Sequence, residues 1–150
     1  MVPAPRLSIG TSDFAVLRQP GVLLVDKTEL IVRVLSDPYQ TLLFPRPRRF
    51  GKSTNLSMLG YFLGKSAVDH SALFQGLAVW RSQEARRHFQ RHPLIYLTFK
   101  DVKCASWSEC LEVIKGLLMN LYAAHSYLQQ GPMEPGAAAA FHALAERRAS

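Results

Sequence analysis

The residues best suited to chemistry in this chain form one basic loop that ends in a lysine and two hydroxyls. The loop reads Arg46-Pro47-Arg48-Arg49-Phe50-Gly51-Lys52-Ser53-Thr54. In the pattern G-x-x-x-x-G-K-[ST], placed between a strand and a helix, backbone N–H groups and the lysine surround phosphates, and the hydroxyl ligates Mg²⁺. The loop has this length and this ending, with Arg46 in place of the first glycine. We therefore expect it to bind a phosphate-bearing ligand.

Each position of the loop has an expected role toward ATP and Mg²⁺. Gly51 lets the backbone approach a phosphate closely because it has no Cβ. Lys52 is expected on the β- and γ-phosphates, and Ser53 is the expected Mg²⁺ ligand. Pro47 fixes its own φ and lacks an N–H, so the front of the loop must differ from one that starts with glycine. The remaining predicted nucleotide contacts are Arg48, Arg49, Phe50 and Thr54.

A plainer interpretation is that the loop is only a basic stretch. Short arginine-rich segments bind nucleic acid or serve as targeting signals, and Gly-Lys-Ser alone carries little information. The segments on either side favour the phosphate loop. An apolar run at 41–44 precedes it, and apolar residues three to four positions apart follow it over 52–63.

The elements expected to position this loop alternate between strand and helix patterns. Short apolar or β-rich runs predict strands at 22–25, 41–44 and 94–99. Helical spacing predicts helices at about 52–63 and 107–128. Strands separated by helices argue for a parallel sheet with right-handed connections. The predicted fold class is therefore α/β, a P-loop NTPase-like three-layer parallel sheet.

Residues that start or stop helices add detail to this prediction. Thr11 or Ser12 is expected to cap a short helix over 13–17, and Asp26, with Glu29 three positions later, to cap a second helix. Gly64 is expected to end the helix that follows the loop. A further capping-box pattern starts the long helix and reads Ser106-Trp107-Ser108-Glu109.

Composition excludes several classes of protein. The chain has 150 residues, of which 48% are hydrophobic and 19% charged, values typical of a globular domain. Its formal net charge is +7, which suits phosphate-bearing partners. It has no apolar run of about 20 residues and no signal-peptide pattern at its start. Cys104 and Cys110 fit no disulfide or metal pattern, so we expect reduced thiols and a cytoplasmic protein.

Several segments, taken in order, resemble the AAA-ATPase-like family, predicted P-loop ATPases that are often joined to a PD-(D/E)XK nuclease-like domain. The matching segments lie at 9–14, 25–28, 46–53, 55–59, 73–77 and 93–101. In that family an arginine commonly starts the loop, so the resemblance implies that Arg46 does not inactivate it. It also implies ATP and Mg²⁺ as ligands.

The family resemblance also implies an acidic Walker B strand beyond the long helix. No apolar strand ending in Asp-Glu follows Gln130, and neither Glu134 nor Glu146 lies in such a context. We therefore expect residues 1–130 to be the N-terminal part of the ATPase domain, truncated before the Walker B strand. Residues 131–150 would form a Pro/Gly break and an alanine-rich tail. Such a chain is expected to bind nucleotide without hydrolysing it alone.

Other polar residues support weaker hypotheses. Residues 26–28 either border the base or ribose of a nucleotide or simply start a helix. Lys100 and Asp101 either contact a ligand at a strand end or form a turn. His88 and His92 lie four positions apart on a predicted helix but lack the glutamate of a zinc-peptidase motif.

Two kinds of function therefore remain open. The first is an ATP-binding P-loop domain, with self-association also expected because uncovered sheet edges attract further strands. The second is a basic module that binds nucleic acid or protein, for which Arg86, Arg87 and Arg91 would supply a surface. No membrane partner is expected.

Overall fold

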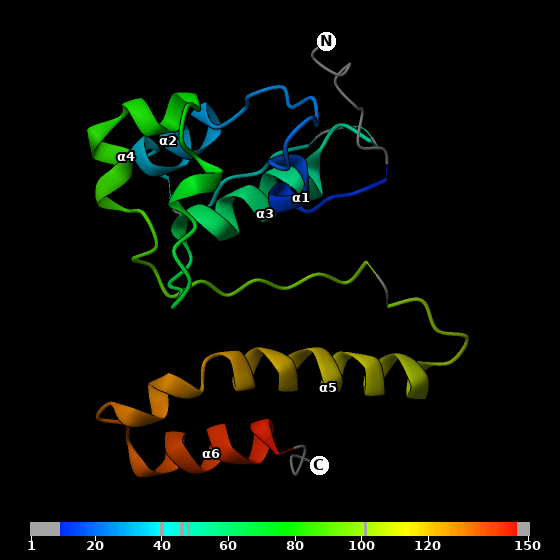
Figure 1. Cartoon of the computed structure of the whole chain (residues 1–150). Coiled ribbons are helices and arrows are strands. Elements are labelled where there is room, and N and C mark those ends of the chain that lie inside the picture. The colour runs from blue at the N-terminus through cyan, green and yellow to red at the C-terminus, as the bar shows by residue number, and fades with distance from the viewer. Residues whose placement is uncertain (1–9, 40, 46, 48, 101, 147–150) are drawn as a thin grey trace. The chain divides into compact units, whose positions relative to one another are not determined.

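The chain forms two compact units (Figure 1). The computed structural model describes residues 10–39, 41–45, 47, 49–100 and 102–146. The first unit ends at Leu94 and the second begins at Ile95. Arg46, Arg48 and Asp101 of the predicted sites lie outside the described residues.

Both units are helical in the part of the chain that the structure describes. The first contains α1 (Phe14–Leu17), α2 (Glu29–Ser36), α3 (Lys52–Leu63), η1 (Ser71–Leu73), η2 (Ala78–Arg81) and α4 (Gln83–Arg87). The second contains α5 (Trp107–Ala124), η3 (Ser126–Gln130) and α6 (Pro135–Ala145). The predicted helices at 52–63 and 107–128 are thus confirmed, the second as α5 followed by η3.

The predicted α/β fold with a three-layer parallel sheet is wrong. Within the described residues the only β structure consists of isolated bridge positions, with one parallel bridge pairing Gly64 and His92. The segments 22–25, 41–44 and 94–99 form no ladder with one another. A β-rich segment becomes a strand only when a neighbouring strand accepts its hydrogen bonds, and sequence pattern does not supply that neighbour. The expectation that a parallel sheet is truncated before its Walker B strand presupposed this sheet, so it no longer applies.

The helix starts follow their local signals with small shifts. Asp13, rather than Thr11 or Ser12, is the N-cap of α1, and its carboxylate accepts the N–H of Ala15 at 2.9 Å. Thr28, rather than Asp26, is the N-cap of α2. These shifts of one or two residues are the usual uncertainty of helix boundaries. As predicted, α3 ends at Gly64.

The core of the first unit gathers aromatic residues from segments far apart in sequence. Phe14 of α1 stacks on Phe74 with ring centroids 5.1 Å apart, and Phe62 of α3 meets Phe74 edge-on at 4.9 Å. All three rings are buried. Edge-to-face and offset pairs of this kind stabilise beyond the apolar area they bury. They fix α1 and the end of α3 against the 71–76 segment, so α3 is anchored to the core at the end opposite the loop.

The second unit is a helical hairpin. Ser106 accepts the N–H of Glu109 at 3.3 Å, and Glu109 accepts the N–H of Ala105 at 3.2 Å, so the capping-box prediction holds with the reciprocal bond shifted by one residue. Tyr122 of α5 packs edge-on against Phe141 of α6, with centroids 4.9 Å apart. None of the helices described in the chain has the length and apolar character needed to cross a bilayer.

Candidate functional site

The start of α3 is shaped by two residues in left-handed backbone conformations. Gly51, at the N-cap, has φ of 73°, and Arg49, two residues earlier, has φ of 68°. Glycine adopts this conformation without strain, whereas arginine does so at a cost. The carbonyl of Gly51 accepts the N–H of Asn55 at 2.8 Å, which closes the first turn. The chain therefore turns sharply into the helix at the position where the sequence places the loop's second glycine.

The predicted phosphate and magnesium ligands lie on the first turn of α3. Lys52 and Ser53 are exposed there and Thr54 is half-buried. The first N–H groups of a helix have no partner within the helix and carry the positive end of its dipole. The first turn of α3 contains no acidic residue, so no carboxylate of this turn offsets that positive end. Exposed Phe50 and Arg49 precede the turn.

Helix α1 holds α3 in position behind this turn. The hydroxyl of Ser57 accepts the N–H of Phe14 at 3.1 Å, and the hydroxyl of Tyr61 donates to the Asp13 carboxylate at 3.5 Å. Burial, followed by the charge and hydrogen bond of Asp13, raises the pKa of Tyr61 above its ordinary value. Tyr61 therefore stays protonated and able to donate at neutral pH.

Residues 26–28 have different surroundings. Asp26 and Thr28 stabilise the start of α2, whereas Lys27 lines a pocket. One Asp26 oxygen accepts the N–H and the hydroxyl of Thr28, at 2.8 and 2.7 Å, and the other accepts the N–H of Ala78 at 2.7 Å. The hydroxyl of buried Thr28 accepts the N–H of Val79 at 3.1 Å. These two residues thus join the start of α2 to η2. Lys27, between them, lines a pocket together with Gly51 and Thr54.

The hydrogen bonds of Asp26 decide its charge. Burial alone would raise the pKa of the carboxyl, but the hydrogen bonds from Thr28 and Ala78, with the charge of Arg18, outweigh it and lower the pKa below 3.8. Asp26 is ionised at neutral pH and committed to three hydrogen bonds. It is a structural carboxylate in this arrangement.

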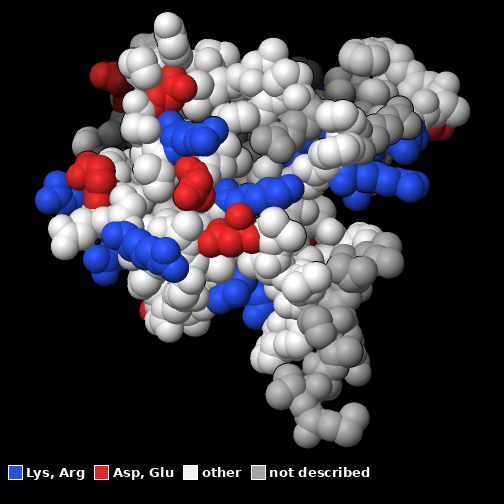
Figure 2. All heavy atoms as spheres, turned by 90° about the horizontal axis from the view of Figure 1, so that it is seen from above, with Lys and Arg blue, Asp and Glu red and all other residues white. Residues whose placement is uncertain are grey.

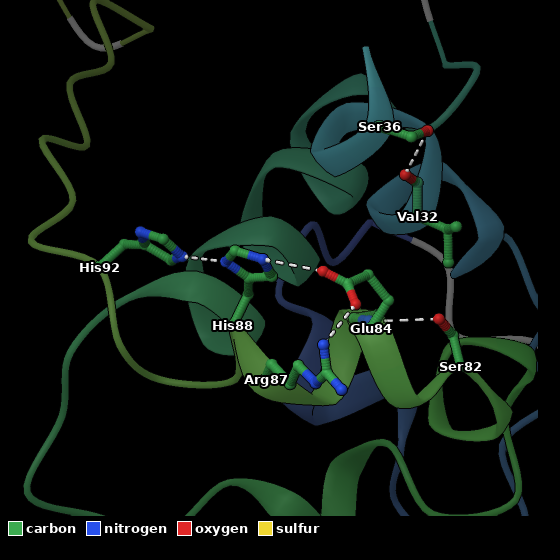
Figure 3. A network of polar contacts seen from close by, with 8 residues as sticks. Val32, Ser36, Ser82, Glu84, Arg87, His88 and His92 are labelled. Carbon is green, nitrogen blue, oxygen red and sulfur yellow. Dashed lines mark hydrogen bonds and ion pairs between the residues drawn. The ribbon is translucent and has the colours of Figure 1, made fainter. Parts of the chain in front are cut away.

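Figure 3 shows the histidine pair, His88 and His92, which follows α4 in the chain. His88 Nδ1 and His92 Nε2 are 3.0 Å apart with stacked rings, and a Glu84 oxygen lies 3.9 Å from His88 Nε2. The helix predicted to carry both histidines ends earlier, because α4 stops at Arg87. Among the described residues no group of three or more His, Cys, Asp or Glu side chains could hold a metal ion.

The arginines near this pair do not form a purely basic surface. Arg87 donates to Glu84 at 3.1 Å. Acidic side chains lie between basic ones over much of the face seen in Figure 2.

In the second unit Cys104 and Cys110 are free, as predicted, and burial, with Cys110 and Glu109 nearby, raises the pKa of the Cys104 thiol. A raised pKa keeps that sulfur in the less reactive thiol form.

The apolar walls of the pocket beside the loop were not predicted from the sequence. They come from α1, from the 23–25 segment and from α3, and are Phe14, Leu17, Leu23, Leu24, Val25 and Met58. Thr54 and Met58 are four positions apart, so the sequence alone could have shown that they lie on the same side of α3. Nothing local in the sequence shows that α1 faces the same space.

Comparison with known proteins supports one family. The family described as a predicted AAA-ATPase matches residues 8–148, nearly the whole chain. No curated protein matches, and no solved structure does. A match of this extent, in agreement with the loop at the start of α3, shows that the chain belongs to the AAA-ATPase-like family.

Proposed function

We propose that this chain binds ATP with Mg²⁺ at the start of α3. The observation that carries the proposal is the left-handed Gly51 followed at once by Lys52 and Ser53 on a helical turn without acidic residues. This arrangement aims backbone N–H groups at one point in front of the helix, where a phosphate would be stabilised. The family, described as a predicted ATPase, supports the same ligand.

The residues of the loop divide the work by their chemistry. Lys52 places a cation beside the β- and γ-phosphates, and Thr54 and the N–H groups of the turn hold phosphate oxygens. Arg49 and Phe50 lie on the approach to the turn, and Arg48 belongs to the same proposed contact set. Arginine suits paired phosphate oxygens because its guanidinium donates two parallel hydrogen bonds.

Magnesium fits this site through one protein ligand. Ser53 is exposed on the first turn, where its hydroxyl would bind the ion together with phosphate oxygens. Mg²⁺ keeps several waters and commonly takes only one or two protein ligands at nucleotide sites, so a single hydroxyl is sufficient. Asp26 is held by Thr28 and Ala78, which leaves it unsuited to positioning a water. We therefore propose nucleotide binding and assign no hydrolytic residue, and the free thiols favour a cytoplasmic setting.

Calorimetric titration of ATP·Mg²⁺ tests the site through Lys52. We expect Lys52→Ala to weaken binding about ten- to a hundredfold, because it removes a charge-assisted contact of about 1.5–3 kcal/mol. Lys65→Ala is the matched control, since Lys65 follows the opposite end of the same 12-residue helix, about 18 Å away. The control should bind like the parent chain.

Two further variants rank the contacts. Ser53→Ala should cost less than Lys52→Ala, and its cost should vanish without Mg²⁺. Arg49→Ala should cost least in a monomer, because we propose that Arg49 reaches the γ-phosphate of a nucleotide on a neighbouring subunit, a contact that forms only in an assembly. Unchanged affinity in Lys52→Ala would refute the phosphate site. Binding of nucleic acid that weakens steeply with salt would then favour the basic-module alternative.

A further inference from the structure

A pocket of about 180 Å³ opens directly beside the proposed phosphate site. It shares Gly51 and Thr54 with the start of α3, so a ligand whose phosphates lie at that turn would have its next part at the mouth of the pocket. Three separate segments line it. They contribute Phe14 and Leu17 from α1, residues 23–25 and Lys27 from the connection before α2, and Gly51, Thr54, Asn55 and Met58 from α3.

The lining is mostly apolar and includes a few polar side chains. Six of the lining side chains are hydrophobic, and the polar ones are Lys27, Thr54 and Asn55. An inorganic phosphate would gain nothing from such walls, because burying a charge among apolar groups is costly. A flat aromatic ring gains from them on both faces and still exposes its polar edge to the few side chains that can bond it.

The volume identifies which part of a ligand fits. Sites that enclose a whole small molecule measure about 300–1,000 Å³, so this pocket is too small for an entire nucleotide. It is large enough for several water molecules, each of which occupies about 30 Å³ in the liquid. A single ring system is therefore the natural occupant, with the sugar and phosphates outside.

The pocket is built on fixed elements. Ser57 holds the start of α1 through the Phe14 N–H, and Phe14 and Met58 are buried in the core. On the other side, Asp26 holds the connection before α2 through its bonds to Thr28 and Ala78. Anchored walls of this kind need little rearrangement on binding, which lowers the entropic cost of holding a ligand.

We propose that this pocket holds the base of the nucleotide whose phosphates bind at the start of α3. The inference rests on the proposed function and adds the place where the base is held. Val25 and Leu23 form its outer wall, with 70% and 52% of their surfaces exposed. A base seated in the pocket covers both side chains.

The test compares ATP with inorganic tripolyphosphate, each titrated with Mg²⁺ into the full chain. Tripolyphosphate has the phosphates without the base, so only ATP should respond to changes in the pocket. We expect Val25→Ser to weaken ATP binding about tenfold and to leave tripolyphosphate binding unchanged. One methylene in a hydrophobic pocket is worth about ten- to two-hundredfold in discrimination, and the low end applies because Val25 is 70% exposed. Val68→Ser is the matched control, because Val68 is 63% exposed and does not line the pocket.

The possible outcomes separate this inference from the proposed function. If Val25→Ser weakens the binding of both ligands equally, or of neither, the base pocket is overturned. The phosphate site still stands in that case, provided that the parent chain binds both ligands. If the parent chain binds neither ligand, the phosphate site fails and the base pocket with it. Leu23→Ser repeats the test at a second exposed wall residue, and far-UV circular dichroism verifies that each variant is folded.

Discussion

At the scale of single residues, Asp26 combines the features that usually mark a catalytic carboxylate with a purely structural set of contacts. It precedes a lysine and a threonine, lies beside the candidate nucleotide pocket and has a lowered pKa. Among the described residues, its hydrogen bonds nevertheless go to Thr28 and to the Ala78 N–H. Perturbed pKa values occur in structural networks as well as at active sites. Here the partners, rather than the pKa, identify the role.

The bonds of Asp26 make the stability of the first unit depend on pH. We expect Asp26→Ala to lower the free energy of unfolding by about 1–2 kcal/mol, because it leaves the Ala78 and Thr28 N–H groups without their acceptor. The folded pKa lies below the ordinary value of 3.8. The carboxylate's contribution is therefore complete well above pH 3.8 and is lost as the pH falls through the folded pKa.

Urea denaturation at pH 7 and at pH 3 measures both effects. Asp37→Ala is the control, since Asp37 accepts only the nearby Tyr39 N–H, at 3.0 Å, among the bonds described. Its loss should have a small effect. A gap between Asp26→Ala and the parent chain that stays constant from pH 7 to pH 3 would contradict the assigned role of the ionised carboxylate.

At the scale of elements, signals carried by a few neighbouring residues located the starts and ends of helices to within one or two positions. Ser106 and Glu109 correctly predicted the start of α5, and Gly64 the end of α3, because caps depend on residues three or four positions apart. The left-handed conformation at Gly51 also suits the residue found there. The predicted site residues from Gly51 to Thr54 accordingly lie together on one helical turn.

The strands could not be predicted in the same way. The 41–44 and 94–99 segments have apolar or β-rich sequences, yet they form no sheet in the described structure. Strand formation depends on hydrogen bonds to a partner distant in sequence, which composition does not reveal. The walls of the pocket were missed for the same reason, since Phe14 and Val25 reach it from different segments.

At the scale of the whole molecule, many large apolar side chains remain exposed. Leu43 is 85% exposed and Ile95 is 72% exposed, and Tyr39, Phe99 and Trp107 are also exposed. Scattered exposed apolar residues are ordinary, but apolar segments in extended conformation offer both side chains and backbone groups to another chain. Self-association was first expected from uncovered sheet edges. It remains a prediction, now because of these exposed apolar side chains.

Sedimentation velocity over a range of concentrations tests self-association. We expect the parent chain to form larger species as its concentration rises, and Leu43→Lys with Ile95→Lys to shift it toward the monomer, because charges on exposed extended segments oppose pairing. Val68→Lys adds charge at an exposed valine elsewhere and should change little. A parent chain that stays monomeric at all concentrations would contradict the prediction.

The long-range bonds of α1 have a consequence for how the protein folds. The bond from Phe14 to Ser57 spans 43 positions, and that from Arg18 to Leu73 spans 55, whereas α5 and α6 are close in sequence. Folding slows as contacts become more distant along the chain, because the loop between them must close first. The helical hairpin should thus form early and the first unit late. In a Trp107→Phe chain, stopped-flow fluorescence of Trp80, which packs on Phe89, should lag behind the gain of far-UV helical signal.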